Sequence, residues 1–256
     1  MAQLLGVLEQ GLIYAVLALG VYITFKILDF PDMTVDSTFP LGAAVTALMI
    51  SNGIHPLLTL PASLLAGAAA GALTGVIHVK FHVRDLLSGI IMMTGLYSIN
   101  LHIAGRANVQ LFSFNTLFKN DFISGLPTGV QPYAPVILMA LVALIVKLLM
   151  DAYLSTRSGF LLRATGDNPT LVASLAKDSG KVKILGLAIA NALVALSGCI
   201  MCQYQRYFDI SMGTGTLVLA VASVIVGTQL LRGLRFLRAT TAVVLGSILY
   251  KGCVAL

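Results

Sequence analysis

The chain has 256 residues, of which 58% are hydrophobic and only 10% are charged. Soluble domains usually carry about 25% charged residues, so this chain has too few charges to cover a water-facing surface. The composition excludes a soluble globular enzyme, a disordered chain and a disulfide-rich scaffold. It predicts an all-α, polytopic bundle of transmembrane helices. About eight spans of roughly 20 residues each make residues 1–256 a single membrane domain.

Apolar runs along the chain predict these eight membrane-spanning helices. They cover about 11–28, 39–51, 57–79, 86–104, 133–150, 185–203, 214–231 and 239–256. The second run is short for a membrane span, and the fourth carries several polar residues. These two runs are therefore candidates for more than a structural role.

The formal net charge of +6 is unevenly distributed along the chain. If the spans alternate in direction, 12 of the 16 Lys and Arg residues lie on one side of the membrane. By the positive-inside rule that side is cytoplasmic, and both termini lie outside. The basic residues thus indicate topology and do not indicate a nucleic-acid partner.

The segment 29–40, Asp-Phe-Pro-Asp-Met-Thr-Val-Asp-Ser-Thr-Phe-Pro, places three carboxylates and two prolines between the first two spans. Proline interrupts helical hydrogen bonding, and non-helical backbone near a bilayer must be buried in protein or line water. Two interpretations stay open. The segment is either a solvated cytoplasmic turn, with Asp36 or Ser37 capping the next helix, or a discontinuous helix along a translocation path.

Polar residues recur in the span 86–104. Thr94, Tyr97 and Ser98 follow i, i+3, i+4 spacing and therefore share one helix face. Because polar groups inside a membrane are costly, this face either lines a path or forms hydrogen bonds between helices. Asn191 in a later span has the same two interpretations.

The cytoplasmic connector 153–184 contains its own helix signals. Asn168 or Asp167 suits an N-cap and Pro169 suits the first turn, and Gly180 is a candidate stop. Leu171, Val172 and Leu175 then line one face. The pattern predicts a short amphipathic helix over residues 168–177. It either lies flat on the lipid headgroups or docks into another protein.

Small residues indicate close helix packing. Gly67, Gly71 and Gly75 form a double G-x-x-x-G pattern, which brings membrane helices together. We favour packing within the chain over a dimer interface. Cys199 and Cys202 have C-x-x-C spacing, but they lie in an apolar run and are expected to be small buried residues. The four histidines lack metal-site spacing, so no metal site is expected.

The longest outer connector covers residues 105–132. It mixes charged, amide and apolar residues. A surface loop with a short helix is the first interpretation, and a docking surface for an extracytoplasmic partner is the alternative.

Several motifs resemble one known family, the ABC-importer permeases of the branched-chain amino acid and ribose type. The matching segments are Ile27–Ala43, Thr156–Pro169 with the helix after it, Ser179–Ile184, Ala195–Gly198, Gly213–Gly215 and Val224–Gly227. The span Leu86–Asn100 is similar to a subgroup of tryptophan/tyrosine-type permeases. One departure is the turn Gly227–Arg238, which is more basic and less glycine-rich than in many relatives.

The resemblance implies a non-catalytic permease subunit in the plasma (inner) membrane, with a path for a small solute, an aromatic or branched-chain amino acid. It implies a second permease subunit forming a homodimer, two ATP-binding subunits, an extracytoplasmic substrate-binding protein and surrounding lipid. The chain has no G-x-x-x-x-G-K-[ST] loop, so no cofactor is expected here and ATP with Mg is expected on the partner ATPase.

The resemblance also assigns candidate site residues. The ATPase-coupling residues are Arg163, Gly166, Asp167, Asn168, Pro169, Leu171, Val172 and Leu175. Independently of the resemblance, the polar residues of the segment 29–40 and of the span 86–104 are the candidates for the translocation path: Asp32, Thr34, Asp36, Ser37, Ser88, Thr94, Tyr97 and Ser98. The alternatives are a nucleoside or sugar permease of the same type, an ion-driven secondary transporter, and a membrane-embedded enzyme that uses Asp29, Asp32 and Asp36.

Overall fold

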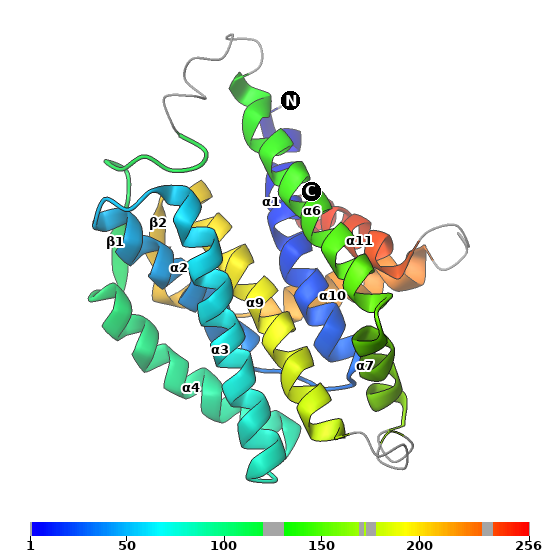
Figure 1. The fold of residues 1–256 in the computed structure, drawn as a ribbon. Helices are drawn as coiled ribbons and strands as arrows, with labels where there is room; N and C mark the ends of the chain where they lie inside the picture. The colour runs from blue at the N-terminus through cyan, green and yellow to red at the C-terminus, as the bar shows by residue number, and fades with distance from the viewer. Residues whose placement is uncertain (1, 120–130, 169–171, 173–177, 232–237, 256) are drawn as a thin grey trace.

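The computed structural model describes residues 2–119, 131–168, 172, 178–231 and 238–255, and it is built almost entirely of helices (Figure 1). The long helices are α1 (Ala2–Val21), α2 (Val35–Ser51), α3 (Thr59–Lys80), α4 (Asp85–Ala104), α6 (Ala134–Leu154), α7 (Arg157–Asp167), α9 (Ser179–Gln205), α10 (Thr216–Leu230) and α11 (Ala239–Ala255). Short elements are the π-helix η1 (Tyr22–Ile27), the 3₁₀ turns η2 (Pro56–Leu58), η3 (Gln131–Tyr133) and η4 (Ile210–Gly213), and strands β1 (Asn108–Gln110) and β2 (Tyr207–Asp209).

The all-α membrane bundle is confirmed, and each of the eight predicted spans corresponds to a helix. Six helices of the described chain are long and apolar enough to cross a membrane. The apolar helices α2 and α11 have 17 residues each and are shorter. Helix α7 was not among the predicted spans, and it lies in the connector between α6 and α9.

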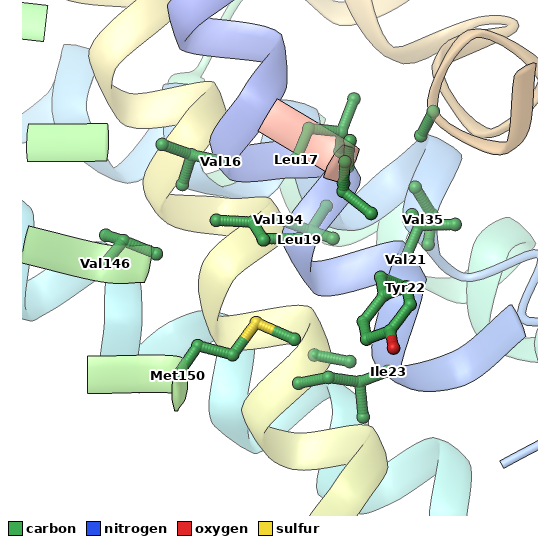
Figure 2. Close-up of a cluster of buried hydrophobic side chains, with 14 of the residues drawn as sticks. Val16, Leu17, Leu19, Val21, Tyr22, Ile23, Val35, Val146, Met150 and Val194 are labelled. Carbon is green, nitrogen blue, oxygen red and sulfur yellow. The ribbon is translucent and has the colours of Figure 1, made fainter. Parts of the chain in front are cut away.

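Helices α1 and α9 form the centre of the bundle. Helix α1 is buried along most of its span, as is α9. Helix α9 packs against α1, α2 and α3, while α11 packs against α1 and α10. Figure 2 shows side chains of α1, α6 and α9 gathered in one cluster, with Val146 and Met150 of α6 beside Val194 of α9.

The α3–α9 contact depends on glycines. A Cβ atom at Gly67 or Gly71 would overlap backbone carbonyl oxygens of α9, at Asn191 and Leu187 respectively. At Gly75 it would meet the backbone of Ile184. The predicted packing within the chain is therefore confirmed for all three glycines.

The outer end of the bundle is closed by a two-stranded sheet. Strands β1 and β2 are antiparallel, with Val109 opposite Phe208, and they join the connector after α4 to the end of α9 (Figure 1). The described part of the outer connector, up to residue 119, therefore contains a strand where we expected a short helix. Residues 120–130 lie outside the described residues.

Near this sheet, Gln203 of α9 forms hydrogen bonds to two neighbouring segments. Its Nε2 donates to Thr59 Oγ1 at 2.8 Å, and its Oε1 accepts from the backbone N–H of Leu117 at 3.1 Å. Cys199 and Cys202 lie nearby, buried and not bonded to each other, as predicted for small buried residues.

Candidate functional site

The first feature of the site is the helix break at residues 28–34. The π-helix η1 ends α1, and backbone bonds from Leu28 to Ile23 and from Phe30 to Thr24 close its last turns. Phe30, Asp32 and Thr34 are buried. The interpretation as a solvated turn is therefore wrong for the inward-facing side chains, and the break is irregular backbone surrounded by protein.

Asp32 anchors this break to α9. Asn191 Nδ2 donates to Asp32 Oδ2 at 2.7 Å, and the backbone N–H of Thr34 donates to Asp32 Oδ1 at 2.9 Å. The hydroxyl of Thr34 lies 3.1 Å from that of Thr74 on α3. All four side chains are buried. A buried carboxylate must be compensated by donors, so this network fixes the break between α3 and α9.

Asp36 caps the start of α10, a helix that is distant from it in the sequence. Its carboxylate accepts from the backbone N–H groups of Leu217 at 2.8 Å and Gly215 at 3.3 Å, and from Thr216 Oγ1 at 3.1 Å. The sequence interpretation that Asp36 or Ser37 caps the following helix is wrong. Asp36 lies inside the first turn of α2 and caps α10 instead, an arrangement that satisfies N–H groups left open at a helix start.

Two glycines make this capping possible. Gly215 has a φ of 80°, in the left-handed region that favours glycine. A Cβ at Gly213 would overlap the Asp36 carbonyl and the Pro40 ring. Because Pro40 has no N–H, the Asp36 carbonyl lacks the usual helical donor four residues on, and the chain of η4 passes closely beside it. The N-terminal ends of α2 and α10 thus lie against each other.

The two faces of α4 differ in their burial, because one packs against α2 and the other is exposed. Ser88, Leu96 and Asn100 are buried, and Asn100 Nδ2 donates to the Ser37 carbonyl of α2 at 2.9 Å. The hydroxyl of Ser37 donates to the Met93 carbonyl at 2.7 Å. These polar groups tie α4 to α2.

The opposite face of α4 is open. The predicted common face of Thr94, Tyr97 and Ser98 is confirmed by the continuous helix, and all three residues are exposed. Thr94 Oγ1 donates to carbonyls of its own helix, at Ile91 and Ile90. Tyr97 and Ser98 have no hydrogen-bond partner among the described residues. An apolar span with such groups on its outside needs a polar neighbour or water.

The predicted path residues thus fall into three groups. Four are buried in contacts within the chain, one caps α10, and three of the four on α4 are exposed. The buried ones are Asp32, Thr34, Ser37 and Ser88. Whether any of them contacts a solute stays a prediction.

Helix α7 is built into the end of the bundle where α6 ends and α9 begins, the end that the basic residues predict to be cytoplasmic. Thr156 Oγ1 accepts from the Gly159 backbone N–H at 3.3 Å and starts the helix. Leu162 and Thr165 are buried. A Cβ at Gly166 would overlap the Ile27 carbonyl at the end of η1, so α7 lies directly against the helix break. Helix α7 is thus in contact with the chain five residues before Asp32.

The predicted helix 168–177 is described only at two positions. Asn168 is the exposed C-cap of α7, and Val172 is fully buried, with its N–H bonded to the Asn168 carbonyl at 3.4 Å. Pro169, Leu171 and Leu175 lie outside the described residues. Arg163 and Asp167 are exposed on α7.

The expected stop at Gly180 is wrong, because Gly180 lies in the first turn of α9. Asp178 caps that helix by accepting from the N–H groups of Gly180 and Lys181. The Lys181 N–H bond, followed by the positive charge of Lys181 and the Gly180 bond, holds the pKa of the Asp178 carboxyl below its usual range. Both ends of the segment 168–178 are therefore fastened to helices of the bundle.

Among the described residues, no three His, Cys, Asp or Glu side chains are arranged to hold a metal ion. The carboxylates Asp32 and Asp36, which an enzyme would need as acid and base, are each occupied by donors within the chain.

Comparison with known proteins decides the family. The model of the family described as branched-chain amino acid transport system / permease component matches residues 3–253. The chain belongs to this permease family. It is a multi-pass protein of the inner membrane, and the family provides the non-catalytic permease components of ABC importers.

Three relatives place it within the family. It is 43% identical over 251 residues to the tyrosine transport system permease protein of Clostridioides difficile (strain R20291), covering 98% of this chain and 81% of the relative. It is 28% identical over 232 residues to the ribose import permease protein RbsC of Escherichia coli (strain K12), covering 90% and 70%. A probable branched-chain amino acid transport permease protein, LivH of Methanocaldococcus jannaschii, is 26% identical, covering 89% and 75%.

Proposed function

We propose that this chain forms the translocation path for an aromatic amino acid, with tyrosine as the first candidate, in an ABC importer energised by a separate ATPase. The 43% identity to a tyrosine transport permease supports the substrate class. The lower identity to ribose and branched-chain amino acid permeases makes those solutes weaker candidates.

The observation that carries the path is the open polar face of α4. Tyr97 is 51% exposed on a helix apolar enough to span the membrane, and Ser98 beside it is exposed too. Lipid tails offer no hydrogen-bond partner, so such a face is stable next to water, solute or another polar helix. We assign it to a path shared with a second permease subunit, as a homodimer.

Energy coupling is assigned to α7 and the segment that follows it. Asp167 and Asn168 are exposed at the end of α7, while Gly166 one residue earlier lies against η1. A partner bound here would displace α7, η1 and α9 together. Coupling needs such a two-state element between the sites. Two ATP-binding subunits would bind this face, and a substrate-binding protein would dock at the opposite end, near β1 and β2.

Reconstitution in liposomes tests the proposal. The permease and its ATPase partner are purified together, and uptake of labelled tyrosine is measured with ATP inside the vesicles. We expect ATP-dependent, vanadate-sensitive uptake that unlabelled tyrosine, tryptophan or phenylalanine inhibits. Uptake driven by an ion gradient alone would make the protein a secondary transporter. Inhibition by ribose only, or by leucine only, would change the proposed substrate to a sugar or to a branched-chain amino acid.

Replacing Tyr97 with alanine tests the α4 face. We expect tyrosine uptake to fall about thirtyfold, since an aromatic contact and a hydrogen bond each contribute about 1 kcal/mol. Thermal stability should stay unchanged because the side chain is exposed. Tyr133→Ala is the matched control, since Tyr133 is 47% exposed at the outer end of α6. Equal uptake by both variants would remove α4 from the path.

A further inference from the structure

A charged cavity lies at the cytoplasmic end of α6, apart from the exposed face of α4. It has a volume of about 530 Å³ and is enclosed by the end of α6, by α7, by the start of α11 and by Tyr22 of η1. Helix α6 ends at Leu154 and α11 begins at Ala239. Since apolar helices end where the hydrocarbon ends, this cavity lies at the membrane–water boundary.

The cavity has more positive than negative charge. Asp151 accepts from Lys147 Nζ at 2.9 Å, from Arg238 Nη1 at 3.1 Å and from Thr240 Oγ1 at 2.6 Å. Arg163 lines the same cavity and has no ion-pair partner among the described residues. Among the residues that line the cavity, two arginines and one carboxylate leave a surplus of one positive charge. An arginine pair of this kind matches a phosphate group.

An apolar stripe leads from the cavity into the membrane. Ile137, Leu141, Leu144 and Leu148 are spaced by four, three and four residues, so they share one face of α6. Each is between 52% and 58% exposed, and Leu148 also lines the cavity. The eleven helical steps from Ile137 to Leu148 rise about 16 Å, close to half of a hydrocarbon core of about 30 Å.

We propose that this cavity binds an acidic phospholipid of the cytoplasmic leaflet, with its phosphate between Arg163 and Arg238 and one acyl chain along the α6 stripe. The charged cavity and the apolar stripe follow one another as the headgroup and the acyl chain do in one lipid molecule. The stripe is also about as long as half of the hydrocarbon core, which is the space that one acyl chain fills. Phe160, 60% exposed on the cavity wall, covers the glycerol region. The proposal goes beyond the transport function, and the side of the membrane is assigned by the distribution of basic residues.

Native mass spectrometry of the purified protein tests this site. The delipidated protein is titrated with phosphatidylglycerol, with phosphatidylcholine of the same acyl chains, and with glycerol 3-phosphate. We expect preferential retention of phosphatidylglycerol and about a tenfold weaker affinity after Arg163→Gln, because one charge-assisted phosphate contact is lost. Arg163 forms no ion pair or hydrogen bond with another described residue, so the variant should fold normally.

Arg157→Gln is the matched control, because Arg157 is an exposed arginine on the same helix that does not line the cavity. It should keep the wild-type preference. Equal binding of both phospholipids, or equal loss in both arginine variants, would overturn the proposal. So would glycerol 3-phosphate binding as tightly as the lipid, or an assembled importer in which the ATPase fills the cavity. Lipid binding is read without transport, so failure here leaves the proposed function untouched.

Discussion

Replacing Gly71 with alanine is expected to destabilise the protein by about 3 kcal/mol, the upper end of the usual cost of overpacking. The added methyl group would overlap the Leu187 carbonyl oxygen and the Asn191 Cβ. Because the first obstacle is backbone of α9, no side-chain rotation relieves the overlap, and α3 must move away. Thermal unfolding of the detergent-solubilised protein measures the effect as a lower midpoint temperature.

Gly252→Ala provides the control for this experiment. A Cβ at Gly252 of α11 meets no atom within 4 Å, and alanine is favoured over glycine in a helix by about 1 kcal/mol. A glycine-to-alanine change at residue 252 should therefore stabilise α11 slightly, whereas the same change at residue 71 should disrupt the α3–α9 contact. A Gly71→Ala protein as stable as the wild type would show that the two helices are not in close contact.

Much of this fold could be predicted because membrane spans are apolar over their whole length. All eight apolar runs are helices, and the glycine pattern on α3 predicted close packing. Helix α7 was missed because it is not an apolar run and buries only Gly159, Leu162 and Thr165. The one local signal was Thr156 followed three residues later by Gly159, a capping arrangement at its start.

The internal contacts of the candidate site were beyond prediction for a different reason. Asp36 caps α10 across 181 residues to Leu217, and Asp32 meets Asn191 across 159 residues. A single sequence shows that each carboxylate needs a partner and does not show which donor the fold brings near. The cavity around Asp151 was overlooked too, although Lys147 four residues earlier is a pairing signal. The polar face of α4 was predictable because it is local.

Replacing Asn191 with leucine is expected to cost about 2–3 kcal/mol of stability, the usual value of a hydrogen bond to a charged group. Leucine has a similar size, so the main loss is the donor on the Asp32 carboxylate. The unpartnered Oδ1 of Asn191 indicates that this side chain is held for its amide N–H groups, one on Asp32 and one on the Leu187 carbonyl. Thermal unfolding again provides the measurement.

Asn100→Leu separates the loss of a charge partner from the loss of any buried amide. Asn100 is equally buried and also has an unpartnered Oδ1, but its Nδ2 donates to a neutral carbonyl, that of Ser37. Its replacement should cost about 1 kcal/mol. In an Asp32→Asn background the Asn191→Leu cost should shrink toward that value, because a neutral amide needs its donor less. An unchanged cost would mean that Asn191 does not compensate the charge at the helix break, and the route from α7 to α9 through Asp32 would lose its anchor.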